Sequence, residues 1–175
     1  VMPSKRLAGL MASAIVSDTV MFKSPTCTQR DRNMAQRMAS LADVSLEQLG
    51  REIFEASAPA DQPVEKLLFT DFKEFHIAGP DFGISQSTFT DSDRHLQRKD
   101  EFLALMHKTM TERGYNLMIL MLTDVLKEGS QLLYIGDPDL AEQAFNASLK
   151  DNVMFLPKVM SRKKQVVPML SALWG

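Results

Sequence analysis

The first third of the chain carries apolar residues at the spacing of amphipathic helices. Apolar positions three or four residues apart share one helix face, and a Ser or Thr before such a run is a typical N-cap. We therefore expect helices opened by Ser4, by Thr28 with Asp31, and by Ser45 with Gln48, the first ending near residues 17–19. Their apolar faces would be Leu7, Leu10, Met11, Ala14 and Ile15, then Met34, Met38 and Leu41, and then Leu46, Leu49 and Ile53.

A segment with two prolines follows these helices. Residues 57–63 read Ser-Ala-Pro-Ala-Asp-Gln-Pro and separate two regions of regular apolar periodicity. Proline among small and polar residues is typical of a linker between domains. We therefore predict a mainly helical part over residues 1–58, a linker over residues 59–65 and a second domain over residues 66–175.

Beyond this linker the pattern changes to mixed strands and helices. The expected strands are residues 71–77, 82–89, 117–122 and 131–135, and the expected helices are residues 92–113 (with Leu96, Leu103, Met106 and Met110 inward), 138–145 and 165–173. The run at residues 117–122 is apolar throughout, as in a central strand that is buried on both faces. The predicted fold class is therefore α/β: a helical N-terminal segment followed by a compact α/β domain with a mixed sheet.

Charge and composition exclude some classes of partner. The chain of 175 residues has a formal net charge of −2, from 20 basic and 22 acidic residues. This balance gives no general attraction for nucleic acid or an anionic membrane, so we expect neither as a partner, and anion binding would need a local cluster. Cys27 is the single cysteine and cannot form an internal disulfide, which favours a reducing, cytoplasmic location.

One local cluster of this kind is the sequence Ser161-Arg162-Lys163-Lys164-Gln165. Its cations precede an apolar helix, and a helix start offers unpaired backbone N–H groups that favour phosphate. The guanidinium of Arg162 and the ammonium of Lys163 would add to such a site. A solvated basic turn without a ligand is the alternative, and the residues alone leave both open.

Lys73 and Asp18 are two further candidates. Lys73 shares a strand face with Phe75 and Ile77, so its ammonium must extend to solvent or meet an anion. Asp18 ends the first predicted helix, where the helix dipole disfavours a carboxylate and a cation would compensate it. An ordinary exposed Asp is the alternative. The histidines are dispersed; His95 and His107 are expected at the surface, so a zinc site is not predicted.

Three segments resemble the family II (manganese-dependent) inorganic pyrophosphatases of the DHH phosphoesterase superfamily, in their C-terminal portion. They are Ala14–Thr26 (AIVSDTVMFKSPT), Asp71–Phe75 (DFKEF) and Ser161–Pro168 (SRKKQVVP), in the family's order. The resemblance implies hydrolysis of inorganic pyrophosphate to two phosphates by a metal cluster in a cleft between two domains. It implies that Asp18 is a metal ligand and that Lys73, Arg162 and Lys163 bind pyrophosphate.

The resemblance also implies Mn²⁺ or Co²⁺ as cofactor, Mg²⁺ with the substrate, and a homodimer for the complete enzyme. The family's N-terminal metal motifs, which include an Asp-His-His triplet, are absent from this chain. No catalytic set is complete here, so we expect an inactive fragment that lacks its N-terminal catalytic domain. A further departure is Ser87 after Gln86, where the family pattern has an aliphatic residue.

Two alternative functions stay open. The first is another DHH phosphoesterase, which would act on polyphosphate or short nucleotides. The second is a non-catalytic module that binds anions or nucleic acid through the basic turn, which the acidic balance disfavours.

Overall fold

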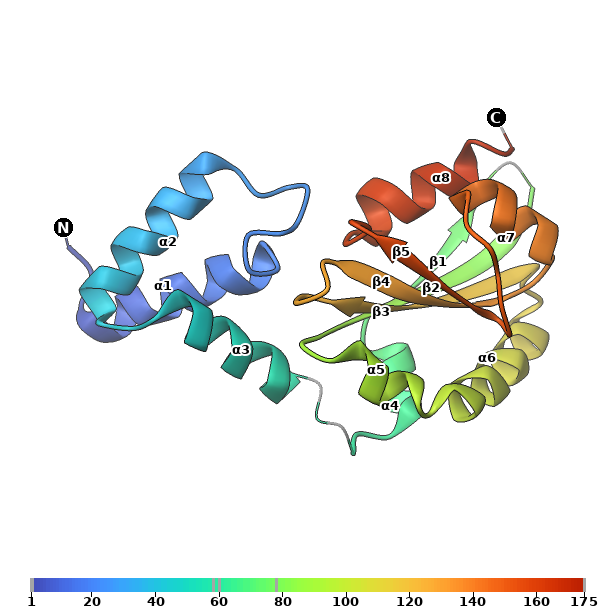
Figure 1. Cartoon of the computed structure of the whole chain (residues 1–175), viewed down its shortest axis with the longest axis horizontal. Coiled ribbons are helices and arrows are strands. Elements are labelled where there is room, and N and C mark those ends of the chain that lie inside the picture. The colour runs from blue at the N-terminus through green and yellow to red at the C-terminus, as the bar shows by residue number, and fades with distance from the viewer. Residues whose placement is uncertain (1, 58, 60, 78, 175) are drawn as a thin grey trace. The chain divides into compact units, whose positions relative to one another are not determined.

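The computed structural model describes residues 2–57, 59, 61–77 and 79–174 of the chain. Its internal contacts divide the chain into two compact units, residues 1–59 and residues 60–175. The first unit contains only helices among its described residues, and the second contains a five-stranded sheet with helices on both faces (Figure 1). The predicted α/β class, with a helical N-terminal segment before a mixed-sheet domain, is confirmed.

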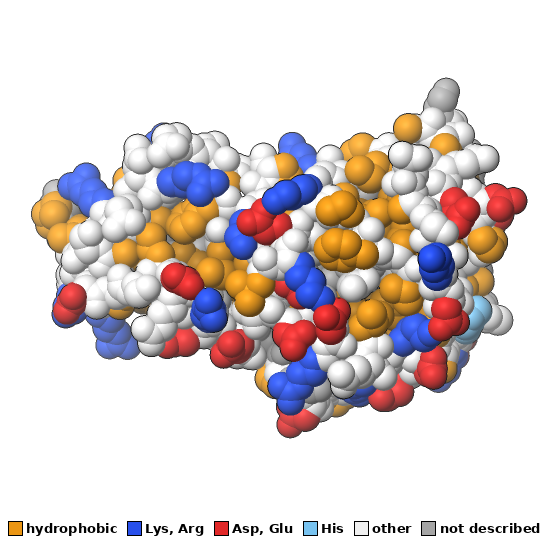
Figure 2. Space-filling view, in the orientation of Figure 1, with side chains coloured by type: hydrophobic (Ala, Val, Ile, Leu, Met, Phe, Trp, Pro, Cys, Tyr) orange, Lys and Arg blue, Asp and Glu red, His pale blue; other side chains and the backbone are white. Residues whose placement is uncertain are grey.

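The first unit consists of α1 (Lys5–Asp18), α2 (Gln29–Ala42) and α3 (Leu46–Ser57). Each begins at the predicted cap: the side chains of Ser4, Thr28 and Ser45 accept backbone N–H groups three residues on. Small residues at the contact let the helices approach closely, and the buried core is Ala8, Ala12, Met38 and Ala42. On the face drawn in Figure 2, apolar side chains gather over this unit between basic and acidic ones.

An unusual left-handed turn follows α1. Val20, Met21 and Phe22 have φ angles of 50°, 51° and 65°, which non-glycine residues adopt at an energetic cost. The hydroxyl of Thr19 accepts the N–H of Phe22 at 3.2 Å, and the guanidinium of Arg32 donates to the Phe22 carbonyl at 2.6 Å. These contacts fix a backbone conformation that the three residues would not prefer alone.

The sheet of the second unit has the strand order β1-β2-β3-β4-β5. The strands are β1 (Phe72–His76), β2 (Asp81–Phe89), β3 (Leu117–Asp124), β4 (Gly129–Ile135) and β5 (Val153–Pro157). Only β2 and β3 are parallel, and the other three pairs are antiparallel, so the sheet is mixed as predicted. Every residue of β3 is buried, which explains why its sequence is a continuous apolar run.

Helices cover both faces of this sheet. On one face lie α7 (Pro138–Phe145), a π-helical turn η1 (Arg162–Val166) and its continuation α8 (Val167–Ser171); on the other lie α4 (Val64–Phe69), α5 (Ser92–Leu96) and α6 (Lys99–Arg113) (Figure 1). The main core lies under α7 and α8 and includes Phe82, Ile84, Ile119, Met121, Leu132, Phe145, Val166 and Leu170. Among the described residues, no helix has the length and apolar content needed to cross a membrane.

The structure corrects several of the helix and strand assignments that were predicted from the sequence. The helix expected over residues 92–113 is interrupted at Arg98, where the backbone (φ −96°, ψ 21°) leaves the helical region. The Arg98 guanidinium binds the carbonyl of Gln62 and the carboxylate of Glu101. Of its expected inward residues only Met106 is fully buried. Strand β5 and helix α4 were not predicted, and α4 already begins at Val64, inside the expected linker. The last helix begins at Arg162 rather than near Gln165.

Candidate anion-binding site

The basic turn lies between β5 and α8, on the sheet face that α7 and α8 cover. Ser161 is its N-cap, and its hydroxyl accepts the N–H of Lys164 at 3.2 Å. The carbonyl of Ser161 accepts the N–H of both Gln165 and Val166, so the first turn is wider than an α-helical one. The cations are therefore held on a defined π-helical turn, not on a loose loop.

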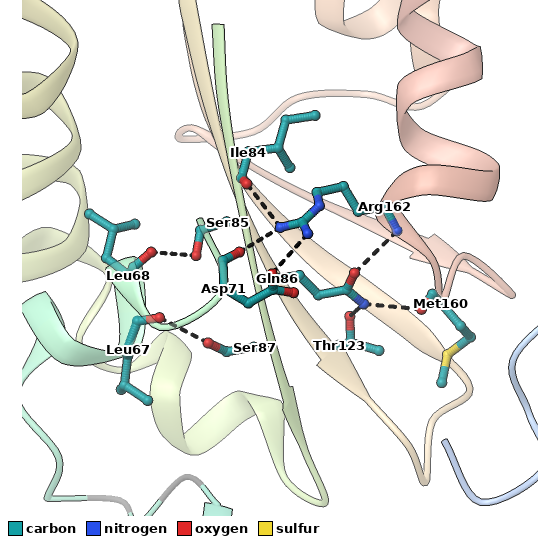
Figure 3. A network of polar contacts seen from close by, with 10 residues as sticks. All are labelled: Leu67, Leu68, Asp71, Ile84, Ser85, Gln86, Ser87, Thr123, Met160 and Arg162. Atoms are coloured by element: carbon teal, nitrogen blue, oxygen red, sulfur yellow. Dashed lines mark hydrogen bonds and ion pairs between the residues drawn. The ribbon is translucent and has the colours of Figure 1, made fainter. Parts of the chain in front are cut away.

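Two glutamine side chains fix this turn. The Gln165 Oε1 accepts the backbone N–H groups of Met160 and Ser161 at 2.9 and 3.0 Å. From β2, the Gln86 Oε1 accepts the N–H of Arg162 at 3.1 Å, while its Nε2 donates to Met160 O (Figure 3). A strand in the middle of the unit thus sets the position of a turn that follows much later in the chain.

This network corrects one argument from the sequence. Unpaired N–H groups at the helix start were expected to favour phosphate, but those of Met160, Ser161, Arg162 and Lys164 already have side-chain partners. Such groups are not free to bind an anion unless a partner leaves. We therefore expect the charged side chains to contribute most of the anion binding at this turn.

The Arg162 guanidinium extends from the turn to the strands β1 and β2. Its Nη1 donates to the carbonyls of Asp71 and Ile84, the latter at 3.1 Å, and its Nη2 lies 2.8 Å from Asp71 Oδ1 (Figure 3). The side chain of Arg162 is only 12% exposed, whereas that of Asp71 is 48% exposed. The guanidinium is thus nearly enclosed, and a half-exposed carboxylate is its counter-ion.

Lys73 lies on β1 beside this guanidinium. It pairs with Ile84 across the two strands, and Ile84 is the residue whose carbonyl Arg162 binds. Lys73 is exposed and shares its strand face with Phe75, which packs against the core under α7 and α8. Its neighbour Glu74 points to the other face and binds Arg113 and Tyr115, so this acid does not neutralise Lys73.

The remaining sequence candidates divide into two groups. Lys163 is exposed on the basic turn together with Lys164, directly after Arg162 in the sequence, and Lys73 is exposed on β1. Asp18 is exposed at the end of α1 in the first unit. Within the described part of the chain, no three His, Cys, Asp or Glu residues form a group that could hold a metal ion. Asp18 therefore has no complete set of metal ligands around it here.

Sequence reasoning missed two residues of this site, Asp71 and Gln86. Asp71 stands two positions before Lys73, and a carboxylate near predicted phosphate-binding cations is a signal for an ion pair. Gln86 interrupts the apolar alternation of β2, and a buried amide needs hydrogen-bond partners. Neither signal identifies the partner, because Arg162 is distant in the sequence.

A second polar cluster lies along β1, the edge strand of the sheet. A groove of about 620 Å³ is lined by Glu74, Phe75, His76, Asp81, Arg113 and Tyr115. Hydrogen bonds from Tyr115 and Arg113 lower the pKa of Glu74 below its usual value. His76 Nδ1 lies 2.6 Å from Asp81 Oδ1. These groups are paired with one another, so they do not compete for the cations of the basic turn.

His95 differs from its expected surface position. It is 4% exposed, and its ring stacks on Phe89 with a centroid distance of 3.8 Å. Burial, with the nearby charges of Arg98 and Arg94, lowers the pKa of His95. The misplacement follows from the break at Arg98, because the sequence reading assumed one continuous helix.

The fold and the site were compared with known proteins. The model of the DHHA2 domain matches residues 51–173, which is more than half of the chain. The chain belongs to the DHHA2 domain family. The match extends from α3 of the first unit to the end of α8 and includes the basic turn and the strands that it contacts.

Curated relatives of this DHHA2 chain are inorganic pyrophosphatases. It is 41% identical over 172 residues to a probable manganese-dependent inorganic pyrophosphatase of Clostridium acetobutylicum, which covers 97% of the chain and 56% of the relative. It is 42% identical over 166 residues to the manganese-dependent enzyme of Methanocaldococcus jannaschii, covering 94% and 54%. A cobalt-dependent inorganic pyrophosphatase of Clostridium perfringens is 41% identical over 171 residues, covering 97% and 31%.

A solved structure gives the same result for the fold. The DHHA2 chain matches the crystal structure described as a family II inorganic pyrophosphatase of Methanococcus jannaschii with a TM-score of 0.86 and 39% identity, over 99% of the chain and 57% of that structure. The predicted resemblance to the C-terminal portion of family II pyrophosphatases is confirmed. The chain spans about half the length of most of these relatives.

Proposed function

We propose that this chain binds inorganic pyrophosphate as the substrate-binding part of a metal-dependent inorganic pyrophosphatase. In that enzyme, pyrophosphate is hydrolysed to two phosphates. The names of the relatives support the reaction, and the cations on the second unit support the part assigned to this chain. Lys73, Arg162 and Lys163 are the proposed substrate-binding residues.

One observation carries the proposal. Arg162 Nη1 binds the carbonyl of Ile84, and Ile84 is the strand partner of Lys73. The guanidinium and the exposed Lys73, which come from different elements, therefore both neighbour Ile84, which supports a shared site. A diphosphate has anionic oxygens on two phosphoryl groups, and separate cations from a strand and a turn suit it better than a single basic turn would.

These cations also suit the chemistry. Cleavage of a phosphoanhydride moves negative charge toward the leaving phosphate, and fixed cations near that group lower the barrier. Arg162 is held by two carbonyls and Gln86, so little reorganisation is needed when the charge develops. Lys73 and Lys163 are exposed and reach the phosphoryl oxygens with flexible ammonium groups.

The metal part of the proposal rests on Asp18. A bound metal cluster supplies a hydroxide nucleophile by lowering the pKa of its water. Asp18 is the proposed single ligand from this chain, for Mn²⁺ or Co²⁺, with Mg²⁺ accompanying the substrate. The described residues do not form a metal site by themselves, so the proposal includes that this chain alone does not hydrolyse pyrophosphate and that the other ligands belong to a catalytic domain outside it.

The proposal also has consequences for partners. The complete enzyme is proposed to be a cytoplasmic homodimer. Nucleic acid is not a partner in this proposal, because a formal charge of −2 gives the chain no general attraction for it.

Calorimetric titration of the whole chain tests the function. Pyrophosphate, orthophosphate and a single-stranded oligonucleotide are titrated separately over a salt series. We expect binding of pyrophosphate that is tighter than binding of orthophosphate, and no oligonucleotide binding at physiological salt. Tight oligonucleotide binding with a steep salt dependence and no pyrophosphate binding would instead favour a nucleic-acid module.

A further inference from the structure

The carboxylate of Asp71 forms an ion pair with the Arg162 guanidinium and is the more exposed of the two groups. Its Oδ1 lies 2.8 Å from Arg162 Nη2, and the Asp71 side chain is 48% exposed against 12% for Arg162. The Arg162 Nη1 has other acceptors, the carbonyls of Asp71 and Ile84. If the carboxylate moved away, the guanidinium would keep these two bonds and would stay in place with an unpaired Nη2 donor.

Asp71 itself is attached less firmly. Its carboxylate accepts one hydrogen bond in the described part of the chain, the bond from Arg162. Rotation of this side chain into solvent therefore breaks a single contact. Of the two partners, Asp71 is the one that can leave, and Arg162 is the one that remains.

A carboxylate and a phosphoryl group use the same kind of contact with a guanidinium: anionic oxygens that face its N–H donors. The ion pair therefore places an internal anion where an incoming phosphoryl oxygen is expected. We propose that Asp71 is a specificity-determining residue that competes with the phosphoryl group for Arg162. This inference rests on the proposed function, and it adds that the affinity of the site is set by the exchange of one anion for another.

Replacement of the Asp71 carboxylate by a phosphoryl group explains how the nearly enclosed Arg162 guanidinium can bind a substrate that arrives from solvent. A nearly enclosed guanidinium without a counter-ion is costly, so Asp71 stabilises the chain before the substrate binds. Pyrophosphate replaces one carboxylate contact and in addition forms ion pairs with Lys73 and Lys163. These two lysines have no acidic partner among the described contacts. Orthophosphate has fewer oxygens with which to reach those lysines, so the same displacement leaves it a smaller net gain.

The test compares Asp71→Asn with the wild-type chain by calorimetric titration with pyrophosphate. The amide keeps the shape of the side chain and removes its charge. We expect pyrophosphate to bind about five- to tenfold more tightly, since a neutral amide competes less well than a carboxylate for the Arg162 guanidinium. The unliganded variant should melt at a lower temperature than the wild type, because its guanidinium has lost a counter-ion. A purely structural role for Asp71 would lower both the stability and the affinity.

Three controls separate the explanations. Asp81→Asn removes the same charge at the distant end of the β1–β2 pair and should leave the affinity near that of the wild type. Asp71→Glu keeps a carboxylate and should bind pyrophosphate more weakly than Asp71→Asn. In an Arg162→Lys background, which keeps the charge but loses the planar fork, most of the gain from Asp71→Asn should vanish. If Asp71→Asn is poorly folded by circular dichroism, Asp71→Ser is the second neutral variant.

The outcomes are distinct. Unchanged or weaker pyrophosphate binding by the folded neutral variants overturns the inference while the wild-type titration leaves the proposed function intact. An equal gain in the Arg162→Lys background also overturns it, because the effect would then be general charge repulsion. If neither the wild type nor Asp71→Asn binds pyrophosphate, the proposed function fails and the inference fails with it.

Discussion

Gln86 and Arg162 are joined by a hydrogen bond of 3.1 Å from the backbone N–H of Arg162 to the amide oxygen of Gln86. The Gln86 Nε2 donates in addition to Thr123 Oγ1 and Met160 O, each at 3.0 Å. A strand residue therefore binds three groups beneath the basic turn, of which Thr123 Oγ1 has a second partner in Ser130 Oγ at 2.9 Å. This contact makes the position of the turn depend on β2.

Replacement of Gln86 by Met should therefore destabilise the chain. The apolar side chain has a similar length but cannot bind the Arg162 N–H or the Met160 carbonyl, for an expected loss of about 2 kcal/mol in the free energy of unfolding. Gln143→Met, on the exposed side of α7, is the matched control and should change stability by less than about 0.5 kcal/mol. Urea denaturation measures both. Equal stability of the two variants would show that the Gln86 bonds contribute nothing net.

The exposed lysines should act on binding and not on folding. Lys73→Gln and Lys163→Gln each remove one ammonium group, and we expect each to weaken pyrophosphate binding about tenfold. Their unfolding free energies should stay within about 0.5 kcal/mol of the wild type. Lys108→Gln, on α6 over the opposite sheet face, has the same charge change and should bind normally. A matching loss in Lys108→Gln would indicate a general charge effect.

Arg162 should affect both properties. Arg162→Ala removes the contacts to Asp71 and Ile84, so the chain should be less stable and should bind pyrophosphate poorly. In a longer protein with a complete metal cluster, we expect turnover to fall by about two orders of magnitude or more. Steady-state kinetics of phosphate release measures this loss. A variant that is folded and turns over at the normal rate would exclude Arg162 from the site.

The chain alone should hold no manganese. Its described residues contain no group of three metal-type ligands, and one exposed carboxylate at Asp18 binds a divalent ion only weakly. We expect no retention of Mn²⁺ after gel filtration, measured by elemental analysis, and no phosphate release from pyrophosphate with added Mn²⁺ or Co²⁺. Asp18→Asn should behave identically in both assays. Stoichiometric retention by the wild type alone would reveal a site that the described contacts do not contain.

Stability should also fall in mild acid because of His95. Its pKa is lowered in the folded chain, mainly by burial, whereas the unfolded chain titrates at the ordinary value of about 6.5. Below that pH the unfolded state binds the proton first, so the free energy of unfolding decreases as the pH falls from about 7 toward 5. His95→Phe should flatten this slope, as measured by urea denaturation at several pH values. His107→Phe, at an exposed position on α6, is the control and should keep the slope.

Much of the fold was readable from local patterns. The caps at Ser4 and Thr28 define helix starts by side-chain chemistry that depends on neighbours three residues away, and the apolar run of β3 reflects burial on both faces. The short β5 was missed because its five residues alternate in burial only once β4 lies beside it. The break at Arg98 was missed because its cause, the bond to Gln62 O, is a contact between distant residues.

The candidate site could likewise be predicted only in part from the sequence. The cations Lys73, Arg162 and Lys163 were identified by residue type, by their place on a strand or turn and by resemblance. Their roles stay predictions until binding is measured. The state of Arg162 was not predictable, because the sequence does not show that Asp71 already pairs with its guanidinium or that Gln86 holds its backbone. Long-range pairing of this kind depends on the register of β1 against β2.

The left-handed turn after α1 also links two positions that are far apart in the sequence. Gly50 in α3 has no side chain, and a Cβ there would lie 2.7 to 2.9 Å from three atoms of Met21. The side chain of Met21, the middle residue of the turn, thus occupies the space that a Cβ at residue 50 would need. A side chain at residue 50 therefore requires the flexible Met21 side chain to shift or residue 21 to become smaller, and we expect the two positions to be interdependent in any library of functional variants.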